Sequence, residues 1–234
     1  MQQFSSGLFF EIVYNTATLS LQKPATIVND IFHQFVTGLR QTSLLEFIAV
    51  ITGIVSVWFS LKENILVYPI GLINTIIYIY LSIKGHLLGE ASVNIYYTIM
   101  SIYGWILWSK KDVSKQAIVI IKHSSAKEWA MHLLFFATFY IGIYLALSYL
   151  KKEFAPGAIP AADAFASASA YTGMWLMAKK KVESWYWWIL TNIASIPLYF
   201  VKGYVFTSFQ FFVLLIMAFA GLAAWHKKAK YARS

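Results

Sequence analysis

The chain has 234 residues, of which 59% are hydrophobic and 12% are charged, about half the charged fraction of an average soluble domain. This composition excludes a soluble globular protein and indicates an integral membrane protein. The formal net charge of +9 comes from lysines in the loops between apolar runs, so it indicates membrane topology and no nucleic-acid partner. The absence of cysteine excludes disulfides, a thiol nucleophile and a cysteine-based metal site.

The N-terminal part is less apolar than the rest of the chain. Residues 3–22 carry Glu11 and Asn15 among apolar residues, which fits either a first membrane span, slightly favoured, or a helix on the membrane surface. Residues 24–42 place apolar side chains at helical spacing with polar ones between them, which is typical of an amphipathic helix at the membrane interface. Residues 1–43 are therefore predicted to form an N-terminal helical extension.

Seven longer apolar segments follow, and each is about the length of a membrane-spanning helix. Their uninterrupted apolar runs lack the alternation of barrel strands, so helices are predicted. The predicted spans are residues 44–61, 65–83, 91–108, 129–150, 158–178, 185–201 and 204–225.

The basic residues indicate the orientation. Of the 19 lysines and arginines, 13 lie on one side of the predicted spans, including the C-terminal tail 227–234, and six lie on the other. By the positive-inside rule the C-terminus is cytoplasmic and the first strong span begins outside.

The chain also contains an internal repeat. A shift of 118 residues superposes six identical pairs, which are Lys62 and Lys180, Tyr68 and Tyr186, Leu72 and Leu190, Asn74 and Asn192, Lys84 and Lys202, and Gly85 and Gly203. Three spans form a first triplet (44–108) and three form a second (158–226), while 109–157 holds a cytoplasmic loop and one linker span. Four helices lie between the starts of the triplets, so both begin on the same side. The predicted fold is an all-α integral membrane protein: seven core transmembrane helices as two parallel three-helix repeats joined by a linker helix, plus an N-terminal extra helix.

The segment Ser184–Gly203 carries the clearest candidate site. Trp185, Trp188 and Asn192 lie at i, i+3 and i+7, so two indoles and an amide share one helix face. Such a face suits a flat small molecule with polar edges. An aromatic belt at the membrane interface is the alternative for the tryptophans, but an amide within a span needs a partner.

Four further residues join the candidate set. Asn74 is included as the repeat equivalent of Asn192, Asp163 and Asn94 as polar groups in or near spans, and Tyr68 because it lies one position past the repeat equivalent of Trp185. The other span tyrosines, Tyr97 among them, are assigned to belt or core. No phosphate loop, H-E-x-x-H pair or nucleophile with a base is present, so we expect no catalytic residue, metal or cofactor.

Several motifs together resemble one family. They are W-Y-W-W-I-L-T-N in the second triplet, I-Y-G-W-I-L-W ending at Trp108, D-A-F-A-S-A-S-A from Asp163, and P-L-Y-F-V-K-G ending at Gly203. Over residues 44–226 the chain resembles the PnuC family of bacterial nicotinamide riboside transporters. The resemblance implies a 3+1+3 helix fold similar to SWEET sugar transporters, and facilitated diffusion of a nucleoside that cytoplasmic phosphorylation traps.

We therefore expect a uniporter for nicotinamide riboside in the bacterial inner membrane, with its site between the triplets near mid-membrane. Trp185 and Trp188 would flank the ring, Asn192 and Asn74 would bind hydroxyls or the carboxamide, and Asp163 would face the pyridinium charge or a ribose hydroxyl. The expected partners are this small molecule and the bilayer, and we expect a homo-oligomer, for example a trimer. The alternatives are a SWEET-like carrier for thiamine or riboflavin, a non-transporting membrane sensor and, third, a membrane enzyme.

Overall fold

The structure is a computed structural model that describes residues 24–84, 88–111, 117–154 and 158–231. Within these ranges the chain is helical, and its only extended pairings are two isolated bridges. The predicted segment 3–22 lies outside the described residues. The helices are α2 (Pro24–Gln41), α3 (Leu44–Leu61), α4 (Val67–Lys84), α5 (Leu88–Ser109), α6 (Ala126–Phe154), α7 (Pro160–Ala178), α8 (Ser184–Val201) and α9 (Val205–Tyr231).

These helices confirm the seven predicted core segments and the amphipathic segment before them. Among the described residues, four helices are long and apolar enough to cross a membrane: α3, α4, α9 and the part of α6 from Ala126 to Tyr149. α7 is richer in small and polar residues, and most of its side chains from Ala164 to Ala178 are buried. Small side chains let neighbouring helices approach closely, which explains how α7 contacts α5, α6 and α8 together.

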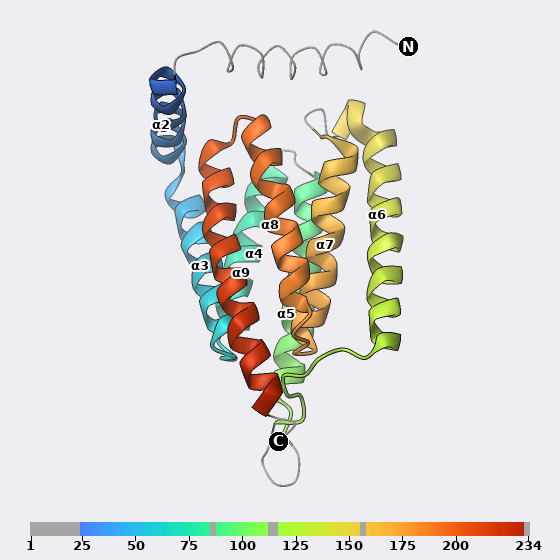
Figure 1. The fold of residues 1–234 in the computed structure, drawn as a ribbon. Helices are drawn as coiled ribbons and strands as arrows, with labels where there is room; N and C mark the ends of the chain where they lie inside the picture. Colours follow the sequence, from blue (N-terminus) through green and yellow to red (C-terminus); the bar gives the residue numbers. More distant parts are fainter. Residues whose placement is uncertain (1–23, 85–87, 112–116, 155–157, 232–234) are drawn as a thin grey trace.

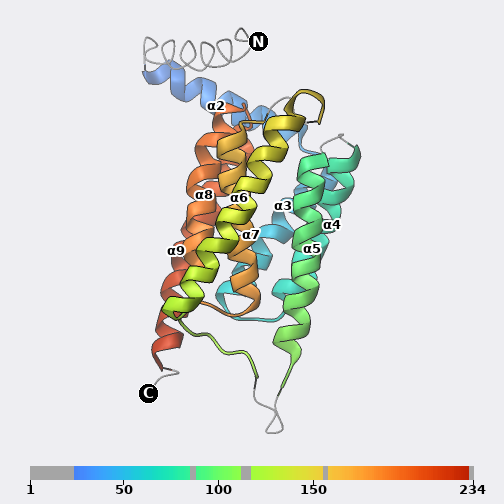
Figure 2. The same ribbon diagram turned by 90° about the vertical axis from the view of Figure 1, so that its right-hand side faces the viewer.

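The six helices of the two predicted triplets form a closed ring. Their contacts run in the order α3, α4, α5, α7, α8, α9 and back to α3. α6 packs on α7 outside the ring (Figure 2), and α2 contacts α9. The triplets therefore meet at two junctions, α5 with α7 and α3 with α9.

The two triplets run in the same direction. In Figures 1 and 2, α3, α5, α7 and α9 descend toward the end that holds the C-terminus, while α4, α6 and α8 ascend. α6 thus returns the chain so that α7 starts at the same end as α3. The predicted parallel repeat with a linker helix is confirmed.

The structural register of the repeat differs by one residue from the predicted one. α4 and α8 correspond from first to last residue at an offset of 117, and α5 and α9 begin at that same offset. Contacts across the junctions also pair residues 117 apart: Ser60 Oγ lies 2.9 Å from Met177 Sδ. The prediction that Asn74 and Asn192 are equivalent is therefore wrong. Helix packing sets the register at an offset of 117. The six identical pairs at an offset of 118 therefore join residues that are one position away from structural equivalence.

The lower end of the helix ring in Figure 1 carries the lysine-rich turns and the C-terminus, and we call it the basic end. Aromatic side chains fill the space between the helices at this end. Trp108 Nε1–H donates to the carbonyl of Ala178 at the end of α7 (3.0 Å). Trp225 Nε1–H donates to the carbonyl of Ser60 near the end of α3 (3.1 Å). The third helix of each triplet thus binds the first helix of the other triplet.

Two more rings complete this cluster. Tyr68 lies edge-on to Trp108, with 5.1 Å between ring centroids, and Trp185 lies edge-on to Trp225, with 5.6 Å. All four residues are at most 7% exposed. We call Tyr68, Trp108, Trp185 and Trp225 the aromatic plug. At the offset of 117 its members form two equivalent pairs, so the plug follows the repeat symmetry.

Ion pairs connect the two triplets beside the plug. Glu63, in the α3–α4 turn, accepts hydrogen bonds from Lys180 in the α7–α8 turn (2.8 Å) and from Lys228 near the end of α9 (2.9 Å). Burial by itself would raise the pKa of the Glu63 carboxyl, but the hydrogen bonds and charges of both lysines outweigh it and hold the pKa below its ordinary value. The carboxylate therefore stays ionised until the pH falls through this lowered pKa, and the cross-link persists above it.

The α5–α6 linker is attached to the α7–α8 turn. Lys122 N–H donates to the carbonyl of Lys180, and Val182 N–H donates to the carbonyl of Lys122, both at 3.2 Å. The buried Glu183 carboxylate contacts His123 Nδ1 (3.0 Å) and accepts bonds from the backbone and hydroxyl of Ser124. The linker consequently lies across the basic end and is attached to the turn that precedes α8.

Candidate functional site

The structure separates the two tryptophans that the sequence placed on one face. Trp188 is partly buried and lies against Gly173 of α7, with its ring centroid 6.3 Å from that of Tyr97 on α5. Trp185 lies in the aromatic plug, 1% exposed, with its ring against the backbone of Gly221 on α9. Only Trp188 reaches the α5–α7 junction in this conformation, and a contact of Trp185 with substrate stays a prediction.

Asn192 lies one turn beyond Trp188, on the same side of α8 and near the middle of that helix. Asn192 is only 4% exposed, yet no described residue forms a hydrogen bond with its side-chain amide. The amide is therefore available to bond with a ligand or a water molecule.

Asn74 lies in a different environment. Its Nδ2 donates to the carbonyl of Ala49 on α3 at 2.6 Å, and the amide packs against Gly53 of the same helix. In the structural register its equivalent is Thr191, whereas Asn192 corresponds to Thr75. The Asn74 amide therefore connects α3 to α4, and the structure does not bring it together with Asn192.

Asp163 is also engaged within the second triplet. One carboxylate oxygen accepts the backbone N–H of Ile159 at 2.6 Å, and the other accepts Lys202 Nζ at 2.7 Å. This pair joins the first turn of α7 to the end of α8, at the end of the ring opposite the plug (Figure 1). Because Lys202 balances its charge, Asp163 has no excess negative charge to offer a cation in this conformation.

Two tyrosines that the sequence did not select complete the site. The Tyr171 ring lies 6.2 Å from that of Tyr97 and 4.1 Å, stacked, from that of Tyr96, between ring centroids. Tyr96 also donates its hydroxyl to the carbonyl of Tyr171 at 3.0 Å, across the junction of the triplets. Tyr97 lies three residues after Asn94 on α5, so the two residues share a helix face. Because Asn94 was already a candidate, this spacing is the sequence feature that could have indicated Tyr97.

We call Tyr97, Tyr171 and Trp188, with the amides of Asn94 and Asn192, the aromatic site. Its members come from α5, α7 and α8. Tyr97, Tyr171 and Asn192 lie near the middle of their helices, and Trp188 lies one turn nearer to the basic end. The site is thus at mid-depth, between the triplets. Tyr68, another predicted member, lies in the plug, and its buried hydroxyl has no hydrogen-bond partner among the described residues.

The lining of the ring does not follow the repeat symmetry at this level. At the offset of 117, Trp188 corresponds to Gly71, and its contact Gly173 corresponds to Ser56, which lies beside Gly71. The large side chain is therefore on α8 in the second triplet and absent from α4 in the first. The scaffold is symmetric, but this indole ring has no counterpart in the first triplet, which favours a single site for a flat ligand.

Two parallel three-helix repeats joined by a linker helix are an architecture of membrane transporters. The chain belongs to the nicotinamide mononucleotide transporter family, which it matches over residues 43–227. This assignment confirms the resemblance seen in the sequence.

Three transporters of known name are similar to this chain. The nicotinamide riboside transporter PnuC of Escherichia coli strain K12 is 23% identical over 209 residues, covering 80% of this chain and 87% of the relative. The nicotinamide riboside transporter PnuC of Neisseria mucosa is 26% identical over 206 residues, covering 86% and 72%. The riboflavin/roseoflavin transporter RibM of Streptomyces davaonensis is 21% identical over 181 residues, covering 77% and 83%.

The fold has a solved counterpart. The crystal structure of the vitamin B3 transporter PnuC superposes with a TM-score of 0.66 at 24% identity, covering 86% of this chain and 88% of that chain. The likeness supports the helix arrangement described above.

Proposed function

We propose that the protein carries nicotinamide riboside across the bacterial inner membrane by uniport, and that cytoplasmic phosphorylation traps the nucleoside. The observation that supports this substrate is the aromatic site. The rings of Trp188 and Tyr97 approach each other from two triplets, and the buried amide of Asn192 lies one turn away without a described partner.

The chemistry of the ligand fits these groups. An electron-poor pyridinium ring is attracted to the faces of Trp and Tyr, as other organic cations are. Its carboxamide and the ribose hydroxyls supply donors and acceptors for the amides of Asn192 and Asn94. Relatives named for nicotinamide riboside are similar to this chain in sequence, which adds support.

Riboflavin is the second candidate, because one similar transporter is named for it. Its larger ring would need more of the α5–α7 junction than a pyridinium. Titration of the purified protein with nicotinamide riboside, thiamine and riboflavin separates the candidates. We expect nicotinamide riboside to bind most tightly, and tighter binding of riboflavin would overturn the substrate assignment.

Uniport has its own test in proteoliposomes. With the membrane potential clamped at zero and no ion gradients, labelled nicotinamide riboside should enter until the inner concentration equals the outer. An imposed Na⁺ or proton gradient should not drive accumulation beyond that level. Accumulation that depends on either gradient would contradict uniport.

The amide of Asn192 should contribute to affinity. We expect Asn192→Ala to raise the dissociation constant of the substrate by about two- to twelvefold, the effect of one hydrogen bond of about 0.5–1.5 kcal/mol. The control is Asn74→Ala, which removes the bond to Ala49 and should lower stability with affinity unchanged. Equal losses of affinity in both variants would contradict the separation of the two residues.

The proposed orientation places the basic end in the cytoplasm. Because the chain has no cysteine, single cysteines at Lys152 and Lys228 can be labelled without removing others. In intact spheroplasts an impermeant reagent should label position 152 and leave position 228 unlabelled. The reverse pattern would show the opposite orientation.

A further inference from the structure

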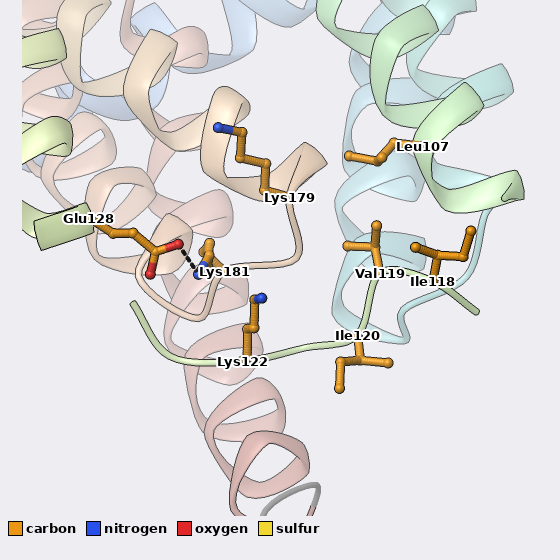
Figure 3. Close-up of a pocket in the computed structure, with 8 residues that line it drawn as sticks. All are labelled: Leu107, Ile118, Val119, Ile120, Lys122, Glu128, Lys179 and Lys181. Atoms are coloured by element: carbon orange, nitrogen blue, oxygen red, sulfur yellow. Dashed lines mark hydrogen bonds and ion pairs between the residues drawn. The ribbon is translucent and has the colours of Figure 1, made fainter. Parts of the chain in front are cut away.

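A pocket lies at the basic end, apart from the aromatic site. It measures about 240 Å³ and is formed by the end of α5, the α5–α6 linker, the start of α6 and the α7–α8 turn. Figure 3 shows its two walls: an apolar one of Leu107, Ile118 and Val119, and a charged one with three lysines and Glu128. The lysines are Lys122, Lys179 and Lys181.

The charges in this pocket do not balance. Glu128 pairs with Lys181 at 2.5 Å, and the Lys181 side chain is only 5% exposed. Lys179 Nζ lies over the ring of Trp175, 4.0 Å from its centroid, and Lys122 Nζ forms no hydrogen bond or ion pair with any described residue. Lys122 and Lys179 therefore line the pocket without an ion pair to any carboxylate of the described residues.

The ammonium group of Lys179 is destabilised by its surroundings in the pocket. Burial, and then the neighbouring charge of Lys181, lower its pKa from the ordinary value. An anion between the ammonium groups would offset both effects. Lysines that only mark topology lie in solvent, whereas Lys181 is buried and Lys179 is half-buried.

We propose that this pocket binds a phosphate group, either of a soluble phosphate ester or of an anionic lipid headgroup. A phosphate ester carries a charge of about −1.5 to −2 and three acceptor oxygens, which matches two uncompensated ammonium groups and a third donor in Lys181. The apolar wall would contact the rest of the ester or the lipid.

The position of the pocket gives the bound anion a consequence. Lys122 comes from the linker, and Lys179 and Lys181 come from the α7–α8 turn, so a phosphate would hold the linker on the turn. The same turn carries Lys180, which pairs with Glu63 of the first triplet across the basic end. Bound phosphate therefore stabilises the closed basic end and, given the proposed function, slows transport.

The test uses the full-length protein with two probes. Ribose 5-phosphate is titrated into protein in neutral detergent, and phosphatidylglycerol is compared with phosphatidylcholine in nanodiscs. Lys122→Gln should weaken binding by about fivefold, the effect of about 1 kcal/mol for a partly exposed charge pair. Glu128→Gln should tighten it, since it removes the only carboxylate among the described residues of the lining. The matched control is Lys127→Gln, which removes a charge from an exposed lysine of the same α6 turn outside the pocket and should change nothing.

The outcomes separate the two sources of phosphate. Binding of ribose 5-phosphate with this order of variants supports a soluble ester, and selective stabilisation by phosphatidylglycerol with the same order supports a lipid headgroup. Binding of neither probe, or equal weakening by Lys127→Gln and Lys122→Gln, would overturn the site. Because these readouts measure anion binding alone, they stand even if nicotinamide riboside proves not to be the substrate. Phosphate binding without any slowing of substrate uptake would refute only the effect on transport.

Discussion

Replacing Trp188 by alanine should raise the dissociation constant of the substrate by about five- to 150-fold. Stacking of a flat ring on an aromatic side chain contributes about 1–3 kcal/mol, and 1.4 kcal/mol is a factor of ten. Phenylalanine should restore part of the affinity because it keeps a π-face, whereas leucine of similar bulk should not. Isothermal titration of the purified variants measures the difference.

Trp185→Ala is the control for this prediction. Trp185 is 1% exposed within the aromatic plug, so its truncation should lower stability by about 3–5 kcal/mol, as for other buried aromatic residues. In the protein that remains folded, affinity should be close to that of the parent. A loss of affinity equal to that of Trp188→Ala would place Trp185 in the binding site and contradict our division between plug and site.

Gly221→Ala should destabilise the protein by about 1–3 kcal/mol, although alanine favours a helix more than glycine does. A Cβ at Gly221 would lie 2.5 Å from the ring of Trp185, which is buried and cannot move aside freely. Gly104, its equivalent at the offset of 117, lies in the same way against Tyr68, so Gly104→Ala should behave alike. Thermal unfolding in detergent measures the change.

The matched control lies on α6. Gly142 is exposed, and a Cβ there would meet nothing within 4 Å, so Gly142→Ala should be neutral or stabilising by up to about 1 kcal/mol. If Gly221→Ala is as stable as Gly142→Ala, the ring of Trp185 does not require the absence of a side chain at Gly221. If only one of Gly104→Ala and Gly221→Ala destabilises, the plug is not symmetric in its energetics.

The class of the protein and the course of its helices follow from the sequence alone. Apolar runs of span length fix the helices because no other backbone structure satisfies its own hydrogen bonds within a single segment in lipid. Four helices between the starts of the triplets require both to begin on the same side, whatever the details of packing. The motifs ending at Trp108 and following Asp163 were also sufficient to indicate the family.

The register and the membership of the site depended on tertiary structure. A count of identities favoured an offset of 118, but the wedging of Tyr68 on Gly104 and of Trp185 on Gly221 sets it at 117. A count of identical residues gives a chance match of Lys-Gly the same weight as a match between buried, contacting residues. The packing of the helices instead depends on the space available to each side chain.

The sequence also could not tell which neighbouring helix each predicted site residue contacts. Spacing along α8 correctly places Trp185, Trp188 and Asn192 on neighbouring positions of one helix surface, yet Trp185 packs on α9 and Trp188 meets α5 and α7. A helix in the middle of a ring touches several neighbours within one face, and periodicity does not tell which neighbour each residue meets. Tyr97 entered the site for the same reason: the closure of the ring brings α5 beside α7, and no local pattern in the sequence contains that contact.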